Sequence, residues 1–323
     1  MMNELKTLTD AIRYFSDEQV CIDTVAAMRW PNGVHCPACL FPEARQHWLA
    51  NQRRWQCREC GKQYSVKVNT IFEDSPIRLD KWLTAMWLLA NCKNGISSYE
   101  IARDIGVTQK SAWFMLQRIR LAMKNKSLLK LGSQGGAVEI DETFIGGKLK
   151  NMHKNKKPKG TGFSGIAGGS MAKTIVAGML ERKGRVRAEV VMERSHPTLR
   201  ALANKHITPG AWVVTDEWGG YKGINFEHVI INHAVEYVNG QIHTNGIENF
   251  WALLKRGLNG TYISVEPFHL DRYVDEQAFR YNNRATEDNP LTDKDRFMLA
   301  LSQISGKRLT YAELTGKVGD PQV

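Results

Sequence analysis

Two acidic pairs, Asp141-Glu142 and Asp216-Glu217, each follow a short apolar run with the composition of a buried strand. A pair of glycines comes shortly after each, where it lets a backbone or a phosphate approach closely. Carboxylates at strand ends are typical ligands of Mg²⁺, which keeps its other positions for water and phosphate oxygens. Either aspartate alone is more often a strand-end cap or a solvated charge, but the recurrence of the pair favours a divalent-cation site.

Four of the six cysteines form a second candidate site. They stand as CPAC (Cys36, Cys39) and CREC (Cys57, Cys60), and the C-x2-C-x17-C-x2-C spacing is that of a structural zinc site with four thiolates. The residues between the pairs alternate like strands, and Gly61 follows the second pair where a left-handed turn is expected, so the pattern predicts a zinc ribbon. Two disulfides would need an oxidising compartment, for which the sequence carries no targeting signal.

The stretch HTNGIENFWALLKR, residues 243–256, predicts an amphipathic helix. At 100° per residue its apolar stripe spans about 100° of the helix surface. This stripe consists of Ile247, Phe250, Trp251 and Leu254. Glu248 and Lys255 share one flank of the stripe, whereas Asn249 and Arg256 lie on the opposite side. An ordinary surface helix with solvated charges and a helix that carries an acid and a base into a site both agree with this pattern.

The acidic pairs and this helix belong to a region of alternating strands and helices. We expect strands within 137–147, 173–184, 185–195, 210–221 and 228–235, and helices within 196–207 and 243–256. Three strands, a helix, two strands and a helix suit a mixed sheet flanked by helices, which is an α/β fold.

A helix-turn-helix pattern precedes the sheet region. Ser97 or Ser98 can cap a first helix that runs through Arg103, Gly106 makes a tight turn, and Thr108 can cap a second helix. That second helix would present Gln109, Lys110, Trp113 and Gln117 to a DNA groove and Arg118 or Arg120 to phosphates. A helical hairpin packed on its neighbours agrees with the spacing equally well. The nearby ribbon and the basic charge of the chain favour DNA binding.

The charge of the 323-residue chain indicates a polyanionic partner. Its 44 Lys and Arg exceed its 33 Asp and Glu by 11 charges, and nucleic acid is the leading candidate. No run of about 18 uncharged apolar residues could span a membrane, and the N-terminus lacks the pattern of a secretion signal. These features predict a cytoplasmic protein, associated with the nucleoid when it binds DNA.

Seven motifs in the same order carry a resemblance that covers nearly the whole chain: CPAC…CREC, SSYEIARDIGVTQKSAW, EIDETFIGG, VVTDEWGGY, HTNGIENFWALLKRGLNGTYISV, EQAFRYNNR and GKRLTYAEL. The chain resembles DDE transposases of the IS1595 insertion-sequence family, those with an ISXO2-like transposase domain. The resemblance implies an RNase H-like catalytic core in which Asp141, Asp216 and an acid of the 243–256 helix hold two Mg²⁺ or Mn²⁺ ions.

The third metal ligand varies within the family that the chain resembles, which can carry Asn in place of Glu, usually with a Lys seven residues later. The helical wheel favours Glu248 over Asn249. If the apolar stripe faces the sheet, Glu248 turns toward Asp141 and Asp216, and Lys255 lies about 10 Å along the same edge, where it can contact a DNA phosphate. Arg256 is a further candidate DNA contact.

A lysine-rich loop follows the first acidic pair, and its residues Lys148 and Lys150 are candidate DNA contacts. The simpler interpretation is that this loop is solvated in the free protein. The predicted organisation is an N-terminal helical segment (1–30), a zinc ribbon (31–72), a helix-turn-helix region (73–128), a linker (129–136), the catalytic domain (137–290) and a C-terminal helical extension (291–323). The expected partners are double-stranded DNA, both terminal inverted repeats and target, and further copies of the chain in a dimer or higher oligomer.

Three functions agree with these motifs. The chain could be a transposase that binds terminal inverted repeats and performs cleavage and strand transfer. It could also be a non-catalytic DNA-binding regulator derived from a transposase, or an RNase H-like nuclease without strand transfer. The presence of all three acids favours an enzyme, and the resemblance favours the transposase over the nuclease.

Overall fold

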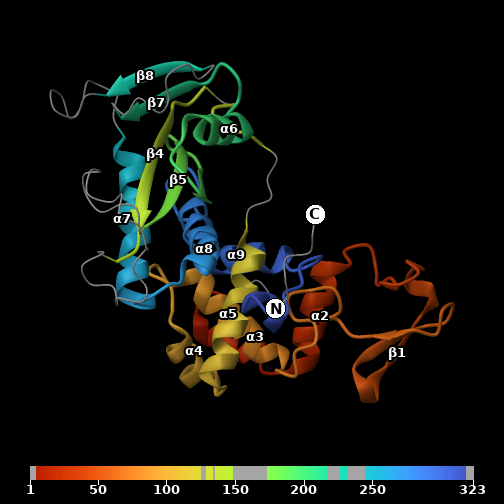
Figure 1. Cartoon of the computed structure of the whole chain (residues 1–323). Coiled ribbons are helices and arrows are strands. Elements are labelled where there is room, and N and C mark those ends of the chain that lie inside the picture. The colour runs from red at the N-terminus through yellow and green to blue at the C-terminus, as the bar shows by residue number, and fades with distance from the viewer. Residues whose placement is uncertain are drawn as a thin grey trace. The chain divides into compact units, whose positions relative to one another are not determined.

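The computed structural model describes residues 5–124, 129–133, 135–147, 173–216, 226–231 and 244–317. The chain forms two compact units (Figure 1). The first consists of Met1–Lys124 together with Asn283–Val323, and the second is Asn125–Asn282. The C-terminal residues therefore belong to the unit that contains the N-terminus.

The first unit begins with helices α1 (Leu8–Tyr14) and α2 (Glu18–Arg29), followed by a small antiparallel sheet. Its strands are β1 (Gln46–Leu49), β2 (Arg54–Cys57) and β3 (Gln63–Tyr64), with 3-10 turns at η2 (Glu43–Arg45) and η3 (Ala50–Gln52). Trp55 stacks on Tyr64 with ring centroids 6.1 Å apart, and Trp30 meets both rings edge-on. Aromatic packing thus supplies the apolar interior of this small ribbon.

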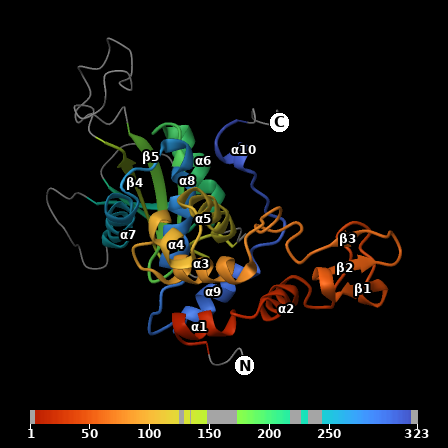
Figure 2. The same cartoon turned by 90° about the horizontal axis from the view of Figure 1, so that it is seen from below.

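Helices make up the rest of the first unit: α3 (Leu79–Asn91), α4 (Ser98–Ile105), α5 (Gln109–Met123), α9 (Asp293–Ser302) and α10 (Tyr311–Leu314). Ser97 caps α4 in a capping box with Glu100, Thr108 caps α5, and Gly106 between them has a left-handed φ of 62°. Figure 2 shows α9 beside α1 and α3. Phe297 of α9 packs against Phe15 and Trp87, so the C-terminal segment completes this core.

The second unit is built on a mixed five-stranded sheet in the order β6-β5-β4-β7-β8. Its strands are β4 (Val138–Ile145), β5 (Thr174–Glu181), β6 (Val186–Val191), β7 (Trp212–Asp216) and β8 (Glu227–Ile231). β4, β5 and β6 pair antiparallel, whereas β4, β7 and β8 run parallel. This is the mixed sheet that the sequence predicts, in the RNase H-like α/β class.

Helices cover both faces of this sheet. α6 (His196–His206) packs on the face that carries Val138, Ile140 and Met179. α7 (Asn245–Gly257) and α8 (Leu270–Asn282) pack on the opposite face (Figure 1). The α7 helix continues into a π-helical turn, η8 (Leu258–Tyr262), and a 3-10 turn, η9 (Pro267–His269), precedes α8.

The predicted strands and helices of the second unit are all present, and so are the two helices of the helix-turn-helix pattern. None of the helices in the described part of the chain is long and apolar enough to cross a membrane.

A partly buried contact between α6 and β6 predicts a pH-dependent stability. Glu189 Oε1 accepts a hydrogen bond from His206 Nε2 at 2.7 Å and from Lys205 Nζ at 2.8 Å. The hydrogen bond to His206, with that to Lys205, holds the pKa of Glu189 at about 2, below its ordinary value. Because the pKa of Glu189 is lower in the folded state than in the unfolded state, its ionised carboxylate stabilises the fold. This contribution to the free energy of unfolding is complete above the unfolded-state pKa and is lost as pH falls toward 2.

Glu189→Gln should therefore have a lower urea midpoint than wild type at pH 5, and the difference should shrink at pH 3. A difference that stays constant between these pH values would show that ionisation of Glu189 contributes nothing.

Candidate active site and zinc centre

Asp141 and Asp216 lie on neighbouring parallel strands at the middle of the sheet. The register pairs Val138 with Val213 and Glu139 with Val214, a spacing of 75 residues. Asp141 and Asp216 have the same spacing and lie two residues beyond the last pair of this register. Asp216 is the last residue of β7, and its side chain lies outside the part of the chain that the structure describes.

Both carboxylate oxygens of Asp141 accept hydrogen bonds. The indole Nε1 of Trp251 donates to Oδ2 at 3.0 Å, and the backbone N–H of Glu142 donates to Oδ1 at 2.8 Å. Asp141 is half-buried. Helix α7 thus contacts the first predicted acid directly, although through a residue that the sequence assigned only to the apolar stripe.

The predicted apolar stripe of α7 is confirmed. It is buried and consists of Ile247, Phe250, Trp251 and Leu254. Glu248 lies three residues before Trp251 and Lys255 lies four residues after it, so both are neighbours of Trp251 on the helix surface. Glu248 is exposed, and its Oε1 accepts a hydrogen bond from Thr244 Oγ1 at 2.9 Å. Asn249, Lys255 and Arg256 are exposed as well.

The two members of the first acidic pair have different surroundings. Strand alternation directs Asp141 toward α7 and Glu142 toward the α6 face. Glu142 is buried, and Arg194 Nε donates to its Oε2 at 2.6 Å. Glu142 is therefore engaged in an ion pair on the α6 face, and Asp141 is the acid of this pair on the α7 face.

A buried carboxylate that the sequence analysis missed, Glu139, also contacts α7. Its Oε2 accepts from the backbone N–H of Ile247 at 2.9 Å, and its Oε1 accepts from Arg182 Nε at 3.1 Å. Its position in the sequence could have identified it, because Glu139 comes two residues before Asp141 and alternate side chains of a strand lie on the same face.

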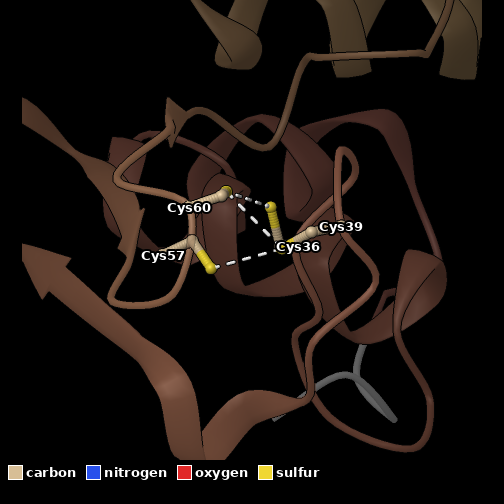
Figure 3. Close-up of side chains that lie close together, drawn as sticks. All are labelled: Cys36, Cys39, Cys57 and Cys60. Atoms are coloured by element: carbon tan, nitrogen blue, oxygen red, sulfur yellow. Dashed lines mark hydrogen bonds between the residues drawn. The ribbon is translucent and has the colours of Figure 1, made fainter.

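The cysteine prediction has a clear structural counterpart (Figure 3). The described residues contain one group of metal-ligating side chains close enough to hold a metal ion, and it consists of these four cysteines. Their sulfurs all lie within 4.8 Å of one another. Cys36 Sγ lies 3.6 Å from Cys60 Sγ, and Cys39 Sγ lies 3.6 Å from Cys57 Sγ. Tetrahedral Zn–S bonds of about 2.3 Å place the sulfurs about 3.8 Å apart, so the cluster fits one zinc ion.

Matching turns shape the two halves of the cluster. Leu40 N–H donates to Cys36 O, and Gly61 N–H donates to Cys57 O. Leu40 and Gly61 have left-handed φ values of 62° and 71°, which confirms the turn predicted at Gly61. The backbone N–H groups of Cys60 and Glu59 also lower the pKa of the Cys57 thiol to about 6, which favours the thiolate that binds metal.

Helix α5 corrects two predicted DNA contacts. Arg118 is 4% exposed, and its guanidinium donates to the carbonyls of Leu309, Ile71 and Glu73. Gln117 is fully buried. The prediction that these two side chains face a groove or a phosphate is wrong, because both are buried, Arg118 against carbonyls from segments before and after α5. Arg120, the alternative phosphate contact, is 1% exposed and fails for the same reason.

The other side chains of α5 that were predicted to contact a DNA groove are exposed or half-buried. Lys110 Nζ lies 4.6 Å from the ring centroid of Tyr311, and Trp113 meets the same ring edge-on at 6.5 Å. Lys110 is exposed and Trp113 half-buried, and Gln109 donates to Ser98 Oγ at 2.9 Å. The predicted DNA contacts Lys148 and Lys150, and Glu217 of the second acidic pair, lie outside the described residues.

Comparison with known proteins agrees with these features. The model of the ISXO2-like transposase domain matches residues 134–282, and that of the transposase zinc-ribbon domain matches residues 16–63. An uncharacterized protein in transposable element ISH50 of Halobacterium salinarum is 24% identical over 257 residues, which cover 77% of this chain and 85% of that protein.

A crystal structure of a pre-cleavage Mos1 transpososome aligns over 68% of this chain and 78% of its own, with 12% identity. Its TM-score of 0.23 is too low to indicate a shared fold. The two domain matches follow one another along the chain and contain the four cysteines and the residues around Asp141, Asp216 and α7. The chain therefore belongs to the IS1595 family of insertion-sequence transposases.

Proposed function

We propose that this transposase binds the terminal inverted repeats of its element and catalyses metal-dependent DNA cleavage and strand transfer. One observation supports the proposal: Asp141 and Asp216 lie on adjacent parallel strands, each two residues beyond the last paired residue, and α7, which carries Glu248, contacts Asp141 through Trp251. Three acids on two central strands and one helix are a suitable ligand set for hard divalent cations.

The residues have separate roles in this proposal. Asp141, Asp216 and Glu248 would hold two Mg²⁺ or Mn²⁺ ions, and such ions would supply activation of the attacking hydroxyl and stabilisation of the leaving oxygen in an in-line displacement at phosphorus. Lys255, one turn beyond Trp251, binds a phosphate of the DNA strand in the site. Glu142 holds no metal, because Arg194 neutralises it on the other face of the sheet.

DNA recognition is assigned to the first unit. We propose a Zn²⁺-bound ribbon over residues 31–72 and a DNA-reading region over 73–128, in which Gln109, Lys110 and Trp113 remain candidate contacts. Arg256 and the loop residues Lys148 and Lys150 would add phosphate contacts near the catalytic domain, proposed over 137–290. The protein would act on DNA in the cytoplasm as a dimer or higher oligomer.

Strand transfer of a labelled terminal-repeat end, in Mg²⁺ or Mn²⁺, tests this function. Wild-type protein should join the end to a target duplex, and Asp216→Ala should not. Equal activity of the two proteins would refute the catalytic assignment. Cleavage without joining would favour the nuclease, and repeat binding without either reaction would favour the regulator.

A further inference from the structure

Two alternate residues of β4 hold helix α7 on the sheet. Glu139 and Asp141 lie on one face of the strand, and each accepts a hydrogen bond from α7, Glu139 from the backbone of Ile247 and Asp141 from the indole of Trp251. The two contacts are one helical turn apart, so they define the position of the helix along the strand.

Glu139 substitutes for a missing helix cap. The residue before α7, Thr244, makes no capping hydrogen bond with its side chain. Ile247 is the third residue of the helix, so its N–H has no partner within the helix. The Glu139 carboxylate, 1% exposed, accepts from this N–H and places a negative charge at the positive end of the helix.

Two glycines allow the close approach of helix and strands. A Cβ at Gly246 would lie 2.8 Å from Glu139 Oε2, and a Cβ at Gly178 would lie 2.6 Å from two carbons of the Trp251 ring. Gly178 is the register partner of Asp141 on β5. The indole therefore rests on bare backbone next to Asp141, which brings its N–H within hydrogen-bond distance of Oδ2.

We propose that Trp251 is a positioning residue for metal binding by Asp141, held in place by Glu139 and Gly178. Trp251 Nε1 and the backbone N–H of Glu142 donate to different oxygens of the Asp141 carboxylate. Donors on both oxygens restrict rotation of the carboxylate, and this restriction is the basis of the positioning role. This inference rests on the proposed function, in which Asp141 is a metal ligand.

Metal binding without DNA tests the proposal, with the full chain and Mn²⁺ as the probe. Trp251→Phe keeps an aromatic ring but removes the N–H. The free Mn²⁺ concentration in a titration is measured by electron paramagnetic resonance. The apparent Kd of Trp251→Phe for Mn²⁺ should be roughly 10- to 100-fold higher than that of wild type, the usual effect of losing a partner that orients a metal ligand. At saturating Mn²⁺ the strand-transfer rate should recover to within a few fold of wild type, which a damaged fold would not permit.

Gly178→Ala provides an independent second variant. Its added methyl group displaces the indole while the N–H is retained, so Mn²⁺ affinity should fall as it does in Trp251→Phe. Trp212→Phe and Gly260→Ala are the matched controls: Trp212 is 42% exposed at the start of β7, and a Cβ at Gly260 meets no atom within 4 Å. Both controls should bind Mn²⁺ as wild type does.

The possible outcomes separate this inference from the proposed function. If wild type binds Mn²⁺ more tightly than Asp216→Ala, but Trp251→Phe equals wild type, the positioning role is wrong and the metal site stands. If wild type binds Mn²⁺ no better than Asp216→Ala, both proposals fail.

Discussion

Strand transfer by Glu248→Gln should be roughly a thousandfold slower than by wild type, a loss of about 4 kcal/mol of transition-state stabilisation. Glutamine has nearly the same shape and keeps an oxygen that can accept from Thr244, but it lacks the negative charge of the proposed third ligand. Because Glu248 is exposed, the substitution should leave the fold unchanged. Single-turnover joining of a precleaved repeat end measures the effect.

The neighbouring Asn249→Ala is the matched control. Asn249 is also exposed but lies about 100° further round the helix, away from Trp251. Its substitution should change the rate by no more than about twofold, as expected for a surface position. The reverse result, with Asn249→Ala inactive and Glu248→Gln active, would identify Asn249 as the third ligand.

The second large effect is expected from loss of zinc. Cys57→Ser should weaken zinc binding by more than about a hundredfold and disorder the ribbon, because a structural zinc ion contributes on the order of 10 kcal/mol to folding. Strands β1, β2 and β3 are short, and the ribbon has little interior besides its aromatic rings. Repeat-specific DNA binding should then fall to the non-specific level, roughly a thousandfold weaker.

Zinc content by atomic absorption and DNA affinity by gel shift measure the two effects. Cys92→Ser is the control, since Cys92 lies outside the cluster and is half-buried. It should retain one zinc ion per chain and wild-type affinity. A Cys57→Ser protein that keeps both would show that the ribbon is stable without a complete zinc site.

Much of the fold could be predicted because its signals are local. Ser97, Gly106 and Thr108 mark the ends of α4 and α5 by side-chain chemistry that acts over three or four residues. The buried stripe of α7 follows from a 3.6-residue period alone. The cysteine spacing likewise predicted which four sulfurs meet.

Contacts between distant segments could not be predicted in this way. Arg118 was predicted to contact a phosphate, but one of its acceptors, Leu309 O, is 191 residues away along the chain. The bond from Trp251 to Asp141 spans 110 residues and depends on Gly178, whose missing side chain gives no positive signal in a single sequence. Periodicity identified Trp251 as buried without showing where its N–H points.

The first unit is interrupted by the second, and this order has a consequence for synthesis on the ribosome. The partners of Phe15, Trp87 and Arg118 include Phe297 and Leu309, which are translated only after residues 125–282. At roughly 5–20 residues per second, those 158 residues take about 8 to 30 seconds to make. The proposed catalytic domain is therefore complete on the nascent chain before the proposed DNA-binding core can close.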